Sequence, residues 1–378
     1  MREVLADKQI VLAVTGSIAA VEDVKLAHSL RRHGALVQGV MSSAACGIIS
    51  PEAITYATGR PTITSISGMV EHVTYCGIGG SADLLLIAPC TANTICKIAA
   101  GIDDTPVTTF ATTAIGRRMP IVIVPAMHES MYCHPAVMEA IRKLEDWGID
   151  FVDPRMEEDK AKLASIEEII LHTERALSGK PLSGRRVLVT GGPCREPLDD
   201  VRVLTTRSSG RMGQEIALEA FRLGAEVSLV HTGPALPCVK NIHAESATEM
   251  RKAVLSVLSG SGADFYVSAA AISDFAPERT EGKIPSGEPV SINLCPLPKL
   301  IDKVIRDFSP VTVAFKLGWD AEERAKAMLK AGASMVVANT PENLGTSSGS
   351  VVLLTPGRRL EISGDKQEIA AAIWSELL

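Results

Sequence analysis

Residues 186–233 read RVLVTGGPCREPLDDVRVLTTRSSGRMGQEIALEAFRLGAEVSLVHTG, and this order of apolar and glycine-rich segments decides the fold. The apolar run 187–189 ends in glycine and proline, as a buried parallel strand does. A helix follows the turn 208–213, ends near Gly224 and precedes a second strand at 226–231. This βαβ order offers backbone N–H groups to a phosphate, but the turn lacks the G-x-G-x-x-G spacing. A phosphate-binding loop and a merely tight turn therefore stay equally open.

Length and composition predict two α/β domains. The chain has 378 residues, 46% hydrophobic and only 4% aromatic, enough for two separate cores. Its net charge of −6 gives no reason to expect nucleic acid or a membrane as a partner. The charged N-terminus does not resemble a signal peptide, and eight cysteines without a C-x-x-C pair favour a reducing cytoplasm over disulfides or zinc.

Strands and helices alternate along both halves, which predicts two doubly wound, Rossmann-like domains. The short Gly/Pro/Ser segment 179–184 is the expected linker, between a domain at 1–178 and a domain at 185–378. In the first half we expect strands at 9–14, 36–41, 83–88, 120–124 and 150–152, and helices at 18–32, 51–58, 92–100, 105–115, 135–146 and 166–177. In the second half we expect further strands at 264–269, 311–315, 335–338 and 351–354.

Three loops of the first half follow predicted strands and therefore share one edge of the sheet: 15–20 (TGSIAA), 88–94 (APCTANT) and 125–131 (PAMHESM). Together they resemble the flavoprotein cysteine decarboxylases, in particular the phosphopantothenoylcysteine decarboxylases, which have a flavodoxin-like fold and bind FMN. Cys90 stands where that family usually has alanine. By this resemblance the FMN site would comprise Gly16, Ser17, Ile18, Ser42, Pro89, Thr91, Ala92, Asn93 and Met127.

Two histidines become catalytic candidates through the same resemblance. A lone histidine is usually structural, but His72 matches the histidine that assists oxidation of the substrate cysteine, after which CO2 leaves. His128 replaces an asparagine that engages the substrate carboxylate, and histidine can also donate that hydrogen bond. Many members carry a flexible clamp with a cysteine, whereas the corresponding segment 153–162 has none.

The second half resembles the phosphopantothenate–cysteine ligases through Glu196-Pro197-Leu198-Asp199-x-Val201-Arg202 and the turn 208–213. The resemblance makes Lys283 a catalytic residue that neutralises phosphate charge. Thr206 replaces an asparagine of the family, and Lys299 replaces an aspartate. The substrate- and nucleotide-binding residues implied are Gly192, Thr206, Ser208, Ser209, Gly210, Met212, Gly213, Ser268, Ala269, Ala270, Asp274, Lys283, Pro298, Leu300, Phe315, Lys316, Lys326 and Lys330.

The two resemblances together imply a bifunctional enzyme of coenzyme A biosynthesis. It would ligate 4'-phosphopantothenate with cysteine using CTP, through an acyl-cytidylate, and then decarboxylate the product with FMN. No protein metal site is expected, because Mg²⁺ would be held by the nucleotide phosphates. We also expect a homo-oligomer with trimeric decarboxylase and dimeric ligase contacts. Two alternatives stay open: a flavin-binding regulatory protein derived from this family, and another flavin cysteine decarboxylase fused to a nucleotide-binding domain.

Overall fold

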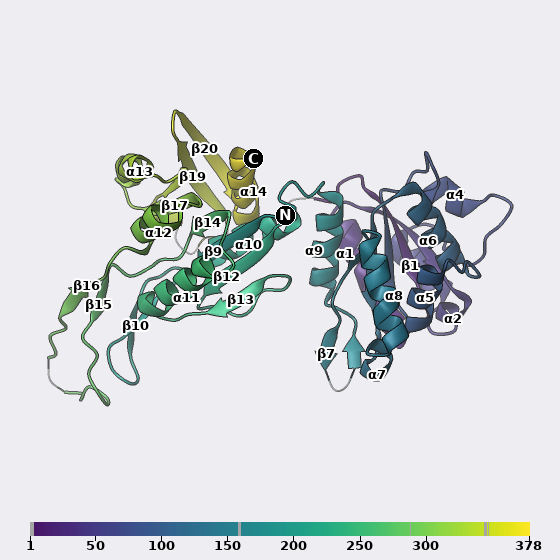
Figure 1. Ribbon diagram of the computed structural model, residues 1–378, viewed down its shortest axis with the longest axis horizontal. Helices are drawn as coiled ribbons and strands as arrows, with labels where there is room; N and C mark the ends of the chain where they lie inside the picture. The colour runs from purple at the N-terminus through teal and green to yellow at the C-terminus, as the bar shows by residue number, and fades with distance from the viewer. Residues whose placement is uncertain (1–3, 158–159, 288, 344–345, 347) are drawn as a thin grey trace. The chain divides into compact units, whose positions relative to one another are not determined.

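The computed structural model forms two compact units, Met1–Lys180 and Pro181–Leu378 (Figure 1). The residues that it describes are 4–157, 160–287, 289–343, 346 and 348–378.

The N-terminal unit is built on a parallel sheet in the order β2-β1-β3-β4-β6. This is the flavodoxin-like arrangement, in which the strand order reverses between β1 and β3. The five strands lie close to the positions expected from the sequence: β1 (Gln9–Val14), β2 (Leu36–Met41), β3 (Leu84–Cys90), β4 (Ile121–Pro125) and β6 (Asp150–Phe151).

Helices cover both faces of this sheet. Ile10, Leu12 and Val14 of β1 pack toward α1, α3 and α9, whereas Val11 and Ala13 pack toward α4, α5, α6 and α8. Burial on both faces explains why the strands are apolar throughout instead of alternating. The helices of the unit are η1 (Ile18–Glu22), α1 (Asp23–Arg32), α2 (Ser43–Cys46), α3 (Pro51–Thr58), α4 (Glu71–Cys76), α5 (Ala92–Ala100), α6 (Pro106–Arg117), α7 (Glu129–Tyr132), α8 (Pro135–Asp146) and α9 (Ile166–Leu177).

The single helix expected at 18–32 is wrong in its first turns. Residues Ile18–Glu22 form a 3₁₀ helix, in which the Ala20 N–H donates to the Ser17 carbonyl at 2.9 Å, and α1 begins only at Asp23. A small antiparallel sheet was also not expected; it joins β5 (Met127–His128), β8 (Lys160–Lys162) and β7 (Arg155–Glu157).

The C-terminal unit contains an eight-stranded sheet in the order β13-β12-β9-β14-β17-β18-β19-β20. The first six strands of this order are parallel and follow the Rossmann arrangement, with the order reversing between β9 and β14. The last two strands form an antiparallel hairpin. The strands are β9 (Arg186–Gly191), β12 (Glu226–His231), β13 (Lys240–His243), β14 (Phe265–Ser268), β17 (Val311–Leu317), β18 (Met335–Asn339), β19 (Ser348–Thr355) and β20 (Arg358–Asp365).

Neighbouring residues of β14 show how helices cover this sheet. Tyr266 packs with α11 and α12, whereas Phe265 meets Trp374 of α14 edge-to-face, with ring centroids 5.4 Å apart. The Trp374 indole N–H donates to the Ile216 carbonyl at 3.1 Å, which joins α14 to α10. The helices are α10 (Arg211–Arg222), α11 (Ala247–Ser259), α12 (Leu300–Phe308), α13 (Ala321–Lys330), η2 (Pro341–Asn343) and α14 (Lys366–Leu377).

Two antiparallel ribbons extend from this unit (Figure 1) and were not expected from the sequence. One pairs β10 (Arg195–Pro197) with β11 (Val203–Thr205), and the other pairs β15 (Phe275–Pro277) with β16 (Leu294–Pro296).

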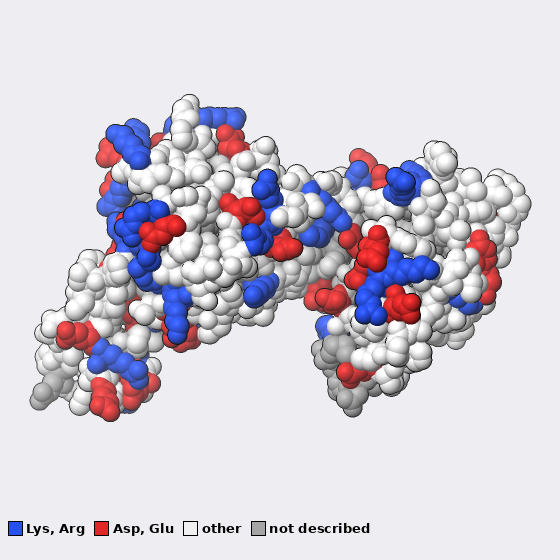
Figure 2. All heavy atoms as spheres, in the orientation of Figure 1, with Lys and Arg blue, Asp and Glu red and all other residues white. Residues whose placement is uncertain are grey.

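Among the described residues, no helix has both the length and the apolarity that a membrane span requires. Basic and acidic side chains lie interspersed on both units over the face shown in Figure 2.

Candidate active sites

The loops after β1 and β3 meet where the strand order of the N-terminal unit reverses. The Thr15 hydroxyl donates to the Pro89 carbonyl at 2.8 Å and accepts from the Thr91 N–H at 3.0 Å. Thr15 is almost fully buried, so its hydroxyl fixes the two loops against each other.

The loops after β2 and β4 are tied to the same edge. The Ser42 N–H donates to the Val14 carbonyl at 3.1 Å, and the Ala126 N–H donates to the Cys90 carbonyl at 3.1 Å. The structure therefore brings together all of the loops for which FMN-binding residues were predicted. Cys90 is buried, and burial raises the pKa of its thiol.

The hydroxyls of these loops have different tasks. Ser42 caps α2 by accepting from the Ala45 N–H, and Thr91 caps α5 by accepting from the Thr94 N–H. Ser17 precedes η1 but its hydroxyl makes no capping bond. The Ser17 hydroxyl is thus available to a ligand at the end of β1.

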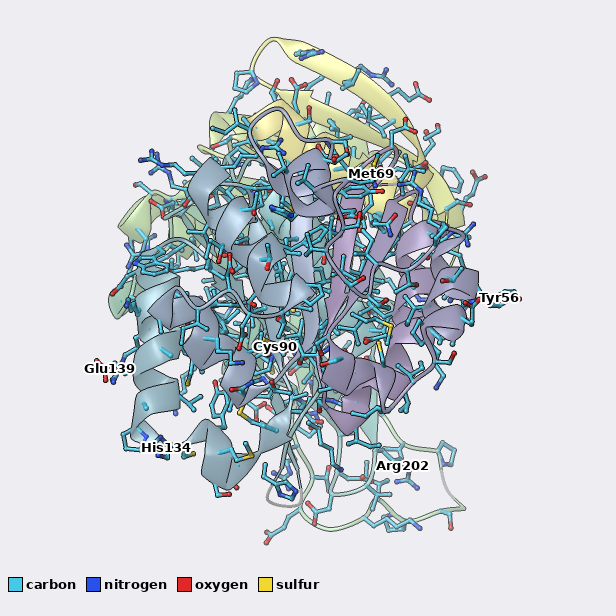
Figure 3. The ribbon with its side chains drawn as sticks, turned by 90° about the vertical axis from the view of Figure 1, so that its right-hand side faces the viewer. Tyr56, Met69, Cys90, His134, Glu139 and Arg202 are labelled. Atoms are coloured by element: carbon cyan, nitrogen blue, oxygen red, sulfur yellow. The ribbon has the colours of Figure 1, made fainter. Side chains whose placement is uncertain are left out.

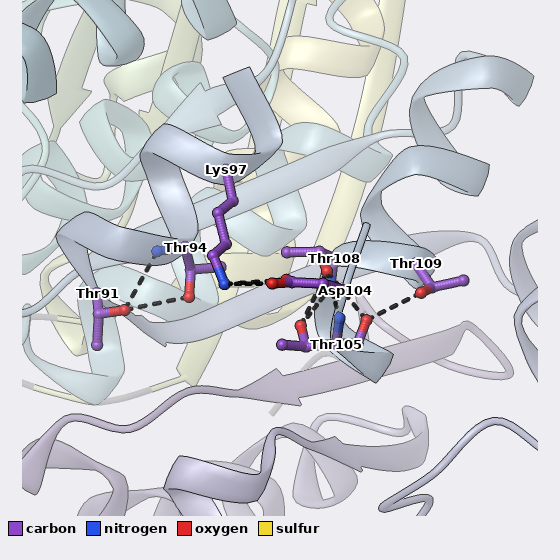
Figure 4. A network of polar contacts seen from close by, with 7 residues as sticks. All are labelled: Thr91, Thr94, Lys97, Asp104, Thr105, Thr108 and Thr109. Carbon is purple, nitrogen blue, oxygen red and sulfur yellow. Dashed lines mark hydrogen bonds and ion pairs between the residues drawn. The ribbon is translucent and has the colours of Figure 1, made fainter. Parts of the chain in front are cut away.

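Further contacts hold the predicted flavin loops in place. A side chain at Gly16 would place its Cβ 2.6 Å from the Ala44 Cβ, so glycine allows this turn to pack on α2. Figure 4 shows how α5, which begins with Ala92 and Asn93, is joined to the start of α6 by the Lys97–Asp104 ion pair of 2.7 Å. These contacts tie the loops to neighbouring helices. The side chain of Ile18, by contrast, is 77% exposed.

His72 comes from an element outside these loops. It lies on α4, where Tyr75 packs against Phe110 of α6 and donates to Gln38 of β2. In Figure 3, Met69, just before α4, lies near the top of the unit, and Cys90, at the end of β3, lies nearer its middle. His72 is partly buried, and among the described residues its Nδ1 has no hydrogen-bond partner.

Met127 and His128 form β5, directly after the Ala126 contact to the flavin loops. The main chain of β5 pairs with β8, which is the last part of the segment 153–162 that corresponds to the clamp. Residues 158–159 of that segment lie outside the described residues. His128 is exposed and stands just before α7, so its ring is open to a ligand at this edge.

A cavity of about 410 Å³ lies at the carboxyl edge of the C-terminal sheet, at the ends of β14, β17 and β18. The turn before α10 contributes one wall and the segment after β14 another. Nine predicted residues line it: Ser208, Ser209, Gly210, Met212, Ala269, Ala270, Asp274, Phe315 and Lys316.

A second cavity of about 140 Å³ shares four of these residues with the first. Its remaining wall is largely apolar and comes from the residues just before and within α12, among them Leu297, Pro298 and Ile301. The predicted residues that line it are Ser268, Ala270, Asp274, Pro298, Leu300, Phe315 and Lys316.

Close glycine contacts shape the wall near α10. A Cβ on Gly210 would lie 2.9 Å from the Cα of Gly192, and a Cβ on Gly213 would lie 2.9 Å from the Cα of Gly191. Gly213 is buried in the packing of α10 on β9 and lines neither cavity. Gly192 and Gly213 thus act on the predicted site through backbone packing.

Lys283 also lines neither cavity, because its loop is attached to the β10–β11 ribbon. The buried Asp199 carboxylate accepts from the Ile284 N–H at 3.0 Å and from the Arg202 guanidinium at 2.7 Å. Asp200 accepts from the Gly282 N–H at 3.1 Å. These donors hold the pKa of Asp199 well below its usual range. The motif quoted for the resemblance thus positions the lysine loop.

Three other predicted residues lie away from the two cavities. Lys326 and Lys330 are exposed on α13, and Thr206 is exposed just before the Ser208 turn. Three basic residues that the sequence analysis did not select line the larger cavity instead: Arg211, Arg324 and Lys366.

The comparisons with known proteins cover both units. The flavoprotein family matches residues 2–178, and the DNA/pantothenate metabolism flavoprotein C-terminal domain family matches residues 182–378. A coenzyme A biosynthesis bifunctional protein of Thermococcus kodakarensis is 48% identical, over 99% of this chain and 95% of its own. The chain belongs to the family of coenzyme A biosynthesis bifunctional proteins.

Another member of this family, from Methanocaldococcus jannaschii, is 35% identical over 98% of this chain and 93% of its own. The crystal structure of the C-terminal domain of a coenzyme A biosynthesis bifunctional protein is 29% identical, covers 52% of this chain and 96% of that one, and has a TM-score of 0.45. The expected bifunctional enzyme, with a decarboxylase and a ligase activity, is confirmed by the family. The roles of the individual site residues stay predictions.

Proposed function

We propose that the C-terminal unit ligates 4'-phosphopantothenate with cysteine at the expense of CTP. The N-terminal unit then decarboxylates 4'-phosphopantothenoylcysteine to 4'-phosphopantetheine with FMN. Family membership supports the two activities, and one observation carries their assignment to sites. In each unit a group of the predicted residues lies at the carboxyl edge of a parallel sheet, the place where open α/β sheets bind ligands.

The loops of the N-terminal unit fit FMN. The unused Ser17 hydroxyl and the side-chain-free Gly16 offer a phosphate group both a donor and close backbone approach. Asn93 and Met127, from the loops after β3 and β4, would flank the rest of the cofactor. Bound FMN supplies the transient two-electron oxidation of the substrate on which loss of CO2 depends. His128, exposed at the same edge, would orient the substrate carboxylate by a hydrogen bond.

The ligase reaction uses two displacements. The carboxylate oxygen of 4'-phosphopantothenate attacks the α-phosphorus of CTP, and pyrophosphate leaves. The amine of cysteine then attacks the acyl carbon of the acyl-cytidylate, and CMP leaves. Lys316 in the cavity and Lys283 on its ribbon would stabilise the charge that develops on the phosphates. Mg²⁺ would bind through the nucleotide phosphates, because this ion is commonly held by substrate phosphates.

The proposal includes a homo-oligomer. His72 lies on α4, outside the flavin loops, and a second copy would bring its own α4 beside these loops. Met69, Val70 and Ile78, which flank α4, expose 76%, 48% and 93% of their surface. Large exposed apolar side chains favour burial between subunits. Light scattering that finds only a monomer would contradict this part.

The function is tested by incubating the full-length protein with 4'-phosphopantothenate, cysteine and Mg²⁺, with either CTP or ATP. Released CO2 and nucleoside monophosphate are measured separately, and the flavin is identified after denaturation. We expect FMN, CMP release that requires both acceptor substrates, and CO2 release that follows it. A colourless protein that refuses FMN and leaves both nucleotides intact would overturn the proposal.

A further inference from the structure

The larger cavity of the C-terminal unit is lined by four basic side chains and by a single acidic one, Asp274. Lys316 comes from β17 and was expected there. Arg211 is the first residue of α10, Arg324 lies on α13, and Lys366 is the first residue of α14. No role for Arg211, Arg324 or Lys366 follows from the motifs of the sequence.

These charges are poorly compensated by the protein itself. Arg324 pairs with Asp320 at 2.8 Å. In the described part of the chain, Arg211 and Lys366 form no ion pair with an acidic side chain. Partial burial and the nearby Arg211 guanidinium both lower the pKa of Lys366. A half-buried ammonium next to a guanidinium, without a carboxylate, is unfavourable unless an anion joins them.

The amino end of α10 adds to this local excess of positive charge. α10 and α14 pack side by side, and Arg211 and Lys366 each occupy the first position of their helix. Asp365 and Glu368 balance the dipole at the start of α14, whereas the start of α10 has only the cation Arg211, which a helix dipole disfavours. α10 has no acidic residue in its first turn, and Gly210 gives it no side-chain cap. The start of α10 thus lacks both a side-chain cap and an acidic residue, and it carries a cation. Such departures from helix preferences are found at binding sites.

We propose that Arg211 and Lys366, with the amino end of α10, form a phosphate-binding subsite in this cavity. The inference rests on the proposed ligase function, in which both 4'-phosphopantothenate and CTP carry phosphate. The ligand chemistry common to both is a phosphate group whose oxygens accept from a guanidinium, an ammonium and free backbone N–H groups. Ser208 and Ser209, which line the same cavity, add hydroxyl groups beside it.

The direct test measures binding of inorganic pyrophosphate and inorganic phosphate to the full-length protein by calorimetry. The variants are Arg211→Gln, Lys366→Gln and the double variant, and Lys252→Gln, an exposed lysine of α11, is the matched control. We expect each single variant to weaken anion binding about tenfold, and the control to bind like the parent. Anion affinities equal to that of the parent in all variants would overturn the subsite.

Thermal unfolding separates a binding role from a structural one. Removing either charge relieves their mutual repulsion, so the free Lys366→Gln protein should unfold at the same temperature as the parent or higher. It should also lose the stabilisation that pyrophosphate gives the parent. A variant that unfolds earlier than the parent yet is stabilised by pyrophosphate to the same extent would show a purely structural role.

Binding measurements with the substrates show whether the phosphate in the subsite belongs to CTP or to 4'-phosphopantothenate. Affinities of 4'-phosphopantothenate and pantothenate, and of CTP and cytidine, are compared between the parent and Lys366→Gln. A loss confined to CTP assigns the subsite to the triphosphate, and a loss confined to 4'-phosphopantothenate assigns it to the phosphomonoester. A parent that binds pyrophosphate through Arg211 and Lys366 but neither substrate keeps the subsite and refutes the proposed function.

Discussion

The two predicted sites differ in how far a single chain assembles them. In the N-terminal unit, hydrogen bonds join the loops that follow β1, β2, β3 and β4 into one edge. In the C-terminal unit the turn before α10 lines a cavity, but Lys283 lies on a ribbon held by Asp199. Short loops that leave neighbouring parallel strands are placed by the sheet, whereas a residue on a long ribbon is placed by contacts that a motif does not reveal.

The largest effect is expected at Asp199, which attaches the loop that carries Lys283 to the β10–β11 ribbon. Asp199→Asn removes the charge that accepts from Ile284 and Arg202. Since a misplaced catalytic group can cost about a hundredfold in rate, we expect CMP release to fall by about that factor while CO2 release from supplied 4'-phosphopantothenoylcysteine is unchanged. Steady-state kinetics of both half-reactions measure this effect.

Asp307→Asn, at an exposed ion pair of α12, is the control and should retain both activities. Because the folded pKa of Asp199 is lowered, its contribution to stability is present above the unfolded pKa and is lost as pH falls through the folded value. An Asp199→Asn protein with normal ligase activity would show that the loop needs no such attachment.

Gly213 tests whether packing of α10 on β9 shapes the ligase cavity. In Gly213→Ala the new Cβ would lie 2.9 Å from the Cα of Gly191 and 3.2 Å from the Thr190 carbonyl oxygen, neither of which can rotate away. Overpacking of this kind costs about 2–3 kcal/mol of unfolding free energy, which calorimetry of the C-terminal unit would measure. Gly116→Ala on the exposed side of α6 meets no atom within 4 Å and should be neutral or stabilising.

The buried carboxyl group of Asp23 makes the stability of the N-terminal unit fall as pH rises, the opposite of the effect of Asp199 in the C-terminal unit. Its fully buried carboxyl oxygens have no hydrogen-bond partner among the described residues, and burial raises its pKa well above the ordinary value. The unfolded chain then binds fewer protons than the folded one as pH rises above about 4, so the parent loses stability by up to about 1.4 kcal/mol per pH unit.

Asp23→Asn should remove this slope, so its advantage over the parent grows from pH 5 to pH 8 in urea unfolding. Asp146→Asn, at the exposed end of α8, should follow the parent at every pH. Parallel stability curves for the parent and Asp23→Asn would contradict a carboxyl group that is kept neutral by burial.

Thr15 tests the hydrogen bonds that join the flavin loops. Thr15→Val keeps the shape but leaves the Thr91 N–H without its acceptor, and the Pro89 carbonyl keeps only the bond from the Thr15 backbone N–H, at a cost of about 1 kcal/mol. We expect FMN affinity, measured by flavin fluorescence, to fall about fivefold. Thr113→Val, which removes a hydroxyl that bonds only within α6, should bind FMN like the parent.

The part of this picture that the sequence predicted is local in origin. The positions of Thr15 and Thr91 could be predicted because the end of a strand and the start of the next helix are recognised from neighbouring residues in the sequence. Lys366 could not, because it meets Arg211 only through the packing of α14 on α10. The position of His72 was equally hidden, since α4 has six residues and begins after Val70, which is in the left-handed conformation. Such a short helix leaves no periodic signal.

Independent sites in one chain are tested most directly by measuring CO2 and CMP release in full-length His72→Asn and Lys283→Gln proteins. The account predicts that His72→Asn loses at least about a hundredfold in CO2 release and keeps CMP release. It predicts that Lys283→Gln loses CMP release by a similar factor and still decarboxylates supplied 4'-phosphopantothenoylcysteine. Loss of both activities in either properly folded variant, or of neither, would contradict it.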